Sequence, residues 1–302
     1  MTRSAKIKRR IFLKKRLGFA SRRLFALVAA ALIAAAAINM REPRKEGLQD
    51  AEDILLSDAS AFRMSYDYFK ELKSLAEKND LDFPELLAAY SLHFGFFQTS
   101  AEEPSTAGME ELCAQILSEY KENEDLKPYE EMFRTLLSEM KTFPVPLSQS
   151  EGSGESPCEY EDTWGSARAY AGARAHEGTD IMDKNNDRGR LQVVSITDGE
   201  VLEFGWYELG GYHVGVKTEN DTYYYYAHLD SFAPGMEKGI KVKAGQLLGF
   251  MGDSGYGREG TKGKFPVHLH VGICPDAAFA KEEFWINPYL FMRNLEDSMA
   301  PS

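Results

Sequence analysis

The distribution of glycine divides this chain into regions that must fold differently. Residues 41–150 contain three of the 25 glycines, whereas residues 151–302 contain 21. Glycine weakens helices, while the tight turns between short strands use it often. We therefore expect an α+β protein with a helical region at 41–143, a Pro/Ser/Gly/Glu-rich linker at 144–157 and a mostly antiparallel β domain at 158–296.

The charges are distributed as unevenly as the glycines. Residues 1–23 carry ten of the 35 Lys and Arg side chains and no acidic one, so all 47 Asp and Glu side chains follow this leader. Nucleic-acid binding depends on Lys and Arg contacts to phosphate, and a strongly acidic body argues against a nucleic-acid partner. Hydrophobic residues make up 43% of the chain, which is enough for a packed core and excludes wholesale disorder.

An apolar run follows the basic leader at 1–23. It reads LFALVAAALIAAAAI from Leu24 to Ile38, while a bilayer crossing needs roughly 17–25 apolar residues. Two interpretations remain open: a transmembrane signal anchor at 24–40, and a signal peptide cleaved near Ala34–Ala37. We favour the anchor because the leader is longer than most signal-peptide n-regions. The positive-inside rule then predicts a single-pass protein of the cell membrane, held in the lipid bilayer by its N-terminal helix, with its C-terminal domain extracytoplasmic.

Amphipathic patterns predict the helices of the region 41–143. Asp82 and Glu85 resemble a capping box, Pro128 suits a first helical turn, and another helix is expected at about 50–78. The region shows no catalytic constellation, so we expect a spacer or a docking surface for a protein partner. The apolar stripe that predicts the last of these helices consists of Tyr129, Met132, Phe133, Leu136, Leu137 and Met140.

The β domain is predicted from short segments rich in Val, Ile, Leu and Tyr that Gly and Asp interrupt. A helical segment is expected only near the end, at 287–297. The expected strands lie within 199–206, 211–218, 222–229, 240–250 and 267–273.

Two neighbouring segments of this domain carry residues that could bind a metal. Alternate residues of a strand face the same side, so His268 and His270 are expected to face one groove. By themselves they fit a metal site and a pair of surface histidines equally well. His176 and Asp180 would lie about 13 Å apart in an extended chain, and Gly178 permits the bend that would bring them together. The combined set of imidazoles and a carboxylate is one that zinc prefers.

A third element is the end of the tyrosine-rich strand at 222–229. Tyr226 and His228 are expected to share a strand face. We expect Tyr226 to bind substrate.

These three elements together resemble the lysostaphin-type zinc endopeptidases, peptidase family M23, also called LytM-like. The resemblance rests on HEGTD at 176–180, YAHL at 226–229 and HLH at 268–270, and covers about residues 158–295. It implies a zinc metalloendopeptidase that hydrolyses peptide cross-links of bacterial peptidoglycan.

The resemblance also implies a role for each motif residue. His176, Asp180 and His270 would bind one zinc ion, and His268 would act as general base or proton shuttle. His228 would steady the attacking water or the oxyanion. The alternative is a scaffold or activator of other cell-wall enzymes, because some relatives have lost their metal ligands. We favour the enzyme since this chain retains every expected position.

Overall fold

The structure is a computed structural model that describes residue 60 and residues 62–96, 103–149, 156–170, 172–275 and 285–299. The basic leader and the predicted anchor at 24–40 lie outside these residues. None of the described helices has the length and the apolar character that a bilayer crossing requires.

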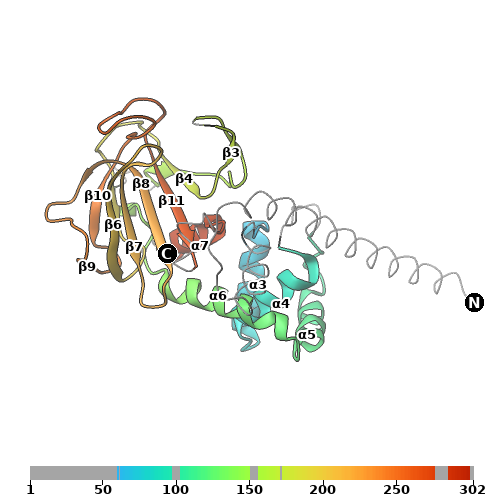
Figure 1. Cartoon of the computed structure of the whole chain (residues 1–302). Coiled ribbons are helices and arrows are strands. Elements are labelled where there is room, and N and C mark those ends of the chain that lie inside the picture. The colour runs from blue at the N-terminus through green and yellow to red at the C-terminus, as the bar shows by residue number, and fades with distance from the viewer. Residues whose placement is uncertain are drawn as a thin grey trace, which may run out of the picture. The chain divides into compact units, whose positions relative to one another are not determined.

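Helices of the described residues lie both before and after a large sheet in the sequence (Figure 1). They match the predicted helical region and the single helical segment near the C-terminus. The start of the helix expected at about 50–78 falls partly outside the described residues. The helices are α3 (Tyr66–Lys78), α4 (Phe83–Phe94), α5 (Met109–Tyr120), α6 (Lys127–Glu139) and α7 (Tyr289–Met299).

Local sequence signals explain where two of these helices begin. The Asp82 side chain accepts a hydrogen bond from the Glu85 backbone N–H at 3.1 Å, which caps the first turn of α4. Pro128 lies in the first turn of α6, where backbone N–H groups have no acceptor within the helix. The N–H that proline lacks therefore costs the helix no hydrogen bond. Both features confirm the starts predicted from the sequence.

The strands of the described residues form a nine-stranded sheet in which neighbours pair antiparallel. The order along its main path is β1-β4-β11-β8-β7-β6-β9, while β10 pairs with β5 and β8. A separate hairpin is formed by β2 and β3. The strands are β1 (Cys158–Glu159), β2 (Ala167–Arg168), β3 (Arg174–Ala175), β4 (Thr179–Asp183), β5 (Gln192–Val194), β6 (Gly199–Tyr207), β7 (Gly211–Lys217), β8 (Tyr223–Phe232), β9 (Lys241–Val242), β10 (Leu247–Met251) and β11 (His268–Cys274).

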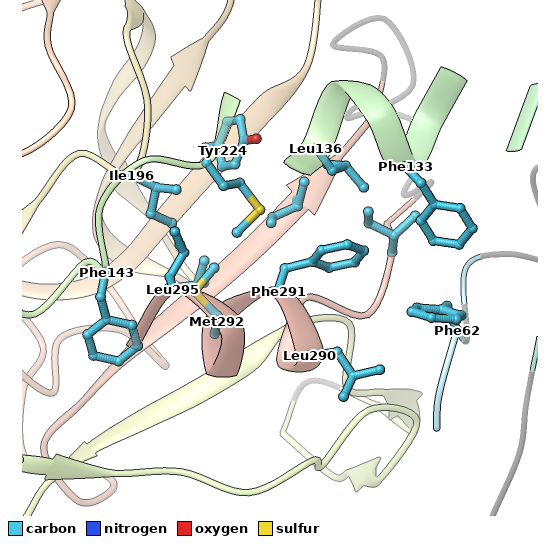
Figure 2. Close-up of a cluster of buried hydrophobic side chains, with 14 of the residues drawn as sticks. Phe62, Phe133, Leu136, Phe143, Ile196, Tyr224, Leu290, Phe291, Met292 and Leu295 are labelled. Carbon is cyan, nitrogen blue, oxygen red and sulfur yellow. The ribbon is translucent and has the colours of Figure 1, made fainter. Parts of the chain in front are cut away.

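The helices and the sheet share one hydrophobic core. Phe291 on α7 lies 6.3 Å from Phe133 on α6 and 6.1 Å from Phe62, measured between ring centroids. Figure 2 shows these rings in one cluster of buried side chains with Ile196 and Tyr224 of the sheet domain. The fold is therefore a mostly antiparallel β domain packed against helices, as the sequence predicts.

The predicted linker at 144–157 begins within packed structure. Val145 is fully buried, and the Pro144 carbonyl accepts a hydrogen bond from the Val194 backbone N–H at 2.9 Å. Residues 150–155 of the linker lie outside the described part of the chain. The boundaries of the predicted domains remain a prediction.

Candidate active site

Three side chains of the sheet domain bring their ligand atoms together. His270 on β11 is the direct cross-strand partner of Asp180 on β4, and His176 follows β3. Asp180 Oδ1 lies 3.0 Å from His176 Nε2 and 2.9 Å from His270 Nδ1, and the two nitrogens are 3.1 Å apart. The antiparallel register thus assembles the three residues that the resemblance implied as ligands.

The geometry and chemistry of these donors fit a zinc ion. Tetrahedral zinc with ligand bonds of about 2.0–2.1 Å separates its donor atoms by about 3.3 Å, which is close to the observed spacing. Burial alone would raise the pKa of the Asp180 carboxyl, but the adjacent His176 and His270 rings hold that pKa well below its usual value. Burial lowers the pKa of His270. A carboxylate and neutral imidazoles are the forms that bind a metal.

Residues around the donors fix their orientation. His176 Nδ1 donates to the Thr163 carbonyl at 3.2 Å, so Nε2 is the nitrogen left to face the other ligands. Arg168 on β2 donates to Asp180 Oδ2 at 2.5 Å, which leaves Oδ1 for the donor cluster. Arg168 was not among the residues predicted from the sequence.

Gly178 is required here because the chain passes very close to the His270 ring. A Cβ at this position would lie 2.5 Å from His270 Cε1 and 2.6 Å from the Val271 carbonyl oxygen. The sequence predicted Gly178 for its freedom to bend. The structure adds a stricter reason, which is the missing volume of a side chain.

Gly178→Ala is expected to weaken metal binding by about 10–100-fold, because the added methyl must displace the His270 ring. Metal titration of the purified chain, followed by chelator competition, measures this change. Gly257→Ala serves as the control, since the three atoms nearest to its Cβ all belong to the Thr261 side chain, the closest at 2.8 Å, and none belongs to a metal donor. Unchanged metal affinity in Gly178→Ala would show that His270 does not bind the metal.

Two further histidines, His228 and His268, lie beside the donors with their ring centroids 4.7 Å apart. His268 Nδ1 donates to the Pro266 carbonyl and His228 Nδ1 to the Ser254 carbonyl, each at 2.8 Å. A carbonyl oxygen only accepts, so both rings carry their proton on Nδ1 and leave Nε2 as the basic nitrogen. Burial lowers the pKa of both histidines, so both rings are neutral and Nε2 is unprotonated at neutral pH.

The backbone at His228 departs from a regular strand and corrects one predicted site residue. His228 has φ +63°, and its N–H donates to the Gly210 carbonyl. This irregularity breaks the alternation of side chains, so His228 lines the groove together with Tyr225 and Ala227. Tyr226 is fully buried on the opposite face, where its hydroxyl accepts a hydrogen bond from the Ile196 N–H at 2.8 Å. The prediction that Tyr226 binds substrate is therefore wrong.

The three donor residues, together with His228 and His268, line one groove with a volume of about 1200 Å³. Tyr170 and Tyr256 stack across it with ring centroids 4.2 Å apart and an interplanar angle of 2°. Tyr225 and Trp285 form part of its wall, and the missing side chain of Gly272 makes room for the Trp285 ring, 3.0 Å from where a Cβ would stand. The groove thus contains three side chains that could hold a metal ion, two neutral imidazoles and aromatic walls.

Comparisons with known proteins agree with this geometry. A family model described as Peptidase family M23 matches residues 174–280. The L-Ala--D-Glu endopeptidase of Bacillus subtilis is 41% identical over 154 residues, and the glycyl-glycine endopeptidase ALE-1 of Staphylococcus capitis is 39% identical over 66 residues. The matched parts cover 51% and 21% of this chain but only 43% and 18% of those relatives, so the chain spans less than half of either protein's length.

A solved structure gives a broader match. It is a Ruminococcus gnavus protein, provisionally named glycyl-glycine endopeptidase lytM, and it is 36% identical with a TM-score of 0.62. The match covers 80% of this chain and 90% of the other. The similarity therefore includes much of the chain outside the peptidase domain.

Proposed function

Because this chain belongs to peptidase family M23, we propose that it is a zinc metalloendopeptidase acting on bacterial peptidoglycan. The observation that carries the proposal is the set of three convergent donors at 2.9–3.1 Å beside two histidines with free basic nitrogens. A structural metal site would have four protein ligands, whereas three leave one position for reactants.

Each residue of the site has a chemical task in this function. His176 Nε2, Asp180 Oδ1 and His270 Nδ1 would hold the zinc ion. When bound, zinc supplies a Lewis acid that polarises the scissile carbonyl and makes a water molecule more acidic. His268 Nε2 takes a proton from the attacking water and returns it to the leaving amine. His228 Nε2 accepts a hydrogen bond from the attacking water and so holds it in place.

Within peptidoglycan, we propose the bond between L-Ala and D-Glu as the target. Of the two curated relatives, the one named for this bond is 41% identical and matches 51% of the chain, whereas the one named for glycyl-glycine bonds matches 21%. The Ruminococcus gnavus structure is provisionally named for glycyl-glycine bonds and matches 80% of the chain at a lower identity of 36%. Incubating purified full-length chain with sacculi of known chemistry, followed by mass spectrometry of the released peptides, tests this choice. New N-terminal D-Glu residues are expected. Release of glycine-terminated fragments would reassign the bond, and no release at all would favour a scaffold or activator.

We propose further that the chain is anchored in the cell membrane by residues 24–40, with the peptidase domain outside the cytoplasm. The basic leader and the apolar run support this orientation. N-terminal sequencing of the mature protein from the membrane fraction should find a start before Leu24. A start near Ile38 or Met40 would show cleavage and secretion instead.

A further inference from the structure

The groove carries a negatively charged group on β6, away from the metal donors. We define the acidic subsite as Glu203, Tyr207 and Tyr223. The hydroxyls of Tyr207 and Tyr223 both donate to Glu203 Oε2, at 2.9 and 3.3 Å. All three residues line the same groove as the metal donors.

Gly215 on β7 makes this arrangement possible. It is the cross-strand partner of Glu203, and a Cβ on it would lie 2.0 Å from the Tyr223 hydroxyl oxygen. The missing side chain lets the Tyr223 ring cross β7 and reach Glu203 on β6. The acidic subsite is therefore built from two strands, β6 and β8, and depends on one glycine of β7, which lies between them.

No cation of the described residues neutralises Glu203. None of the Lys, Arg or His side chains in that part of the chain comes within the 4.0 Å of an ion pair with this carboxylate. His213 stacks on Tyr207 with ring centroids 4.1 Å apart, but burial lowers the pKa of His213 and keeps the ring neutral. Arg168, on the other side of the groove, is paired with Asp180. The carboxylate can therefore accept a cation from a ligand.

The acidic subsite lies within reach of a peptide that is bound at the metal donors. Cross-strand pairs connect Glu203 to Gly215, Gly215 to Tyr225 and Tyr225 to Gly272. Three steps between strands amount to about 14 Å and end on β11, the strand of His270. An extended peptide spans this distance with about four residues. Fewer residues are enough when the charged group is at the end of a long side chain.

We propose that the acidic subsite binds the side-chain ammonium group of a diamino acid residue in the peptide substrate. The inference rests on the proposed endopeptidase function and adds a substrate feature to it. An ammonium group has three donors and would form charge-assisted hydrogen bonds with a carboxylate that two hydroxyls already hold in position.

Peptide binding to the full-length chain tests this proposal. The probes are L-Ala-γ-D-Glu-L-Lys and the same peptide with its lysine amine acetylated, and calorimetry after removal of metal with a chelator prevents cleavage. The unmodified chain should bind the free amine about tenfold more tightly than the acetylated peptide. Glu203→Gln, which keeps the size and one acceptor oxygen, should remove this preference by weakening only the binding of the free amine.

Glu200→Gln is the matched control, because Glu200 lies exposed on the same strand and does not line the groove. It should leave the preference unchanged. Equal affinity of the unmodified chain for both peptides would overturn the acidic subsite, and so would a Glu203→Gln chain that retains the preference. Digestion of sacculi after zinc is restored is measured separately. If the sacculi are not digested, the proposed peptidase function is refuted. The acidic subsite is tested separately, by the difference in binding affinity between the two peptides.

Discussion

His270→Ala is expected to lose both bound zinc and peptidase activity. His270 supplies one of only three donor atoms, and its Nδ1 lies 2.9 Å from Asp180 Oδ1 and 3.1 Å from His176 Nε2. Two remaining donors hold a metal far more weakly than three, so zinc should fall from about one per chain to background. Metal analysis of the purified chain, together with cleavage of sacculi, measures both losses.

His93→Ala is a suitable control for that measurement. His93 lies on α4, outside the groove, and its nearest charged neighbour is Glu119 at 3.6 Å. Its removal should leave zinc content and activity unchanged. A His270→Ala chain that still carries one zinc would show that His270 is not a ligand and would require another donor beside Asp180.

Much of the fold could be predicted because its signals are local. The capping pair Asp82 and Glu85, the proline at 128 and the apolar stripe of α6 each act within one or two helical turns. The stripe predicted its buried side correctly, since Phe133 and Leu136 are almost fully buried. The short strands β1 to β5 were harder to predict, because most of them have too few residues to show a period.

The position of the two histidines of β11 on the groove face could also be predicted, for a different reason. The parity of a regular strand places His268 and His270 on one face, and both line the groove. Their neighbours Leu269 and Val271 are fully buried, as alternation requires. The alternation of side chains failed at His228, because its positive φ places it on the groove face and not on the face of Tyr226. A positive φ at a residue other than glycine has no clear signal in the sequence. The tyrosines of β8 that line the groove are consequently Tyr223 and Tyr225.

Residues that act through pairing between distant strands were not predictable from the sequence. Arg168 meets Asp180 only because the β2–β3 hairpin folds over β4. Glu203 meets Tyr223 across β7, and nothing in either segment alone indicates the contact. The glycine at 215 was a visible signal, but its meaning depends on a register that only the folded sheet defines.

His268→Ala is expected to retain zinc and yet cleave substrate about 10²–10⁴-fold more slowly. His268 faces the same groove as His270, but its Nε2 stands 3.7 Å from Asp180 Oδ1, farther than either donor nitrogen. Its Nδ1–H is held by the Pro266 carbonyl, which aims the basic nitrogen into the groove. A proton acceptor removed from this place slows turnover without taking a donor away from the metal.

His228→Ala should behave similarly, with an equal or smaller loss of rate, because its ring is oriented in the same way by the Ser254 carbonyl. Metal content, circular dichroism and kcat on released peptides distinguish the possible outcomes. Loss of zinc in His268→Ala would make His268 a ligand. An unchanged kcat in His268→Ala, with zinc retained, would instead assign the role of base to His228. The double variant His228→Ala/His268→Ala should then lose no more activity than His228→Ala alone. If His268 transfers the proton while His228 holds the reacting oxygen, as proposed, the losses of the single variants do not add, because the two residues act as a unit.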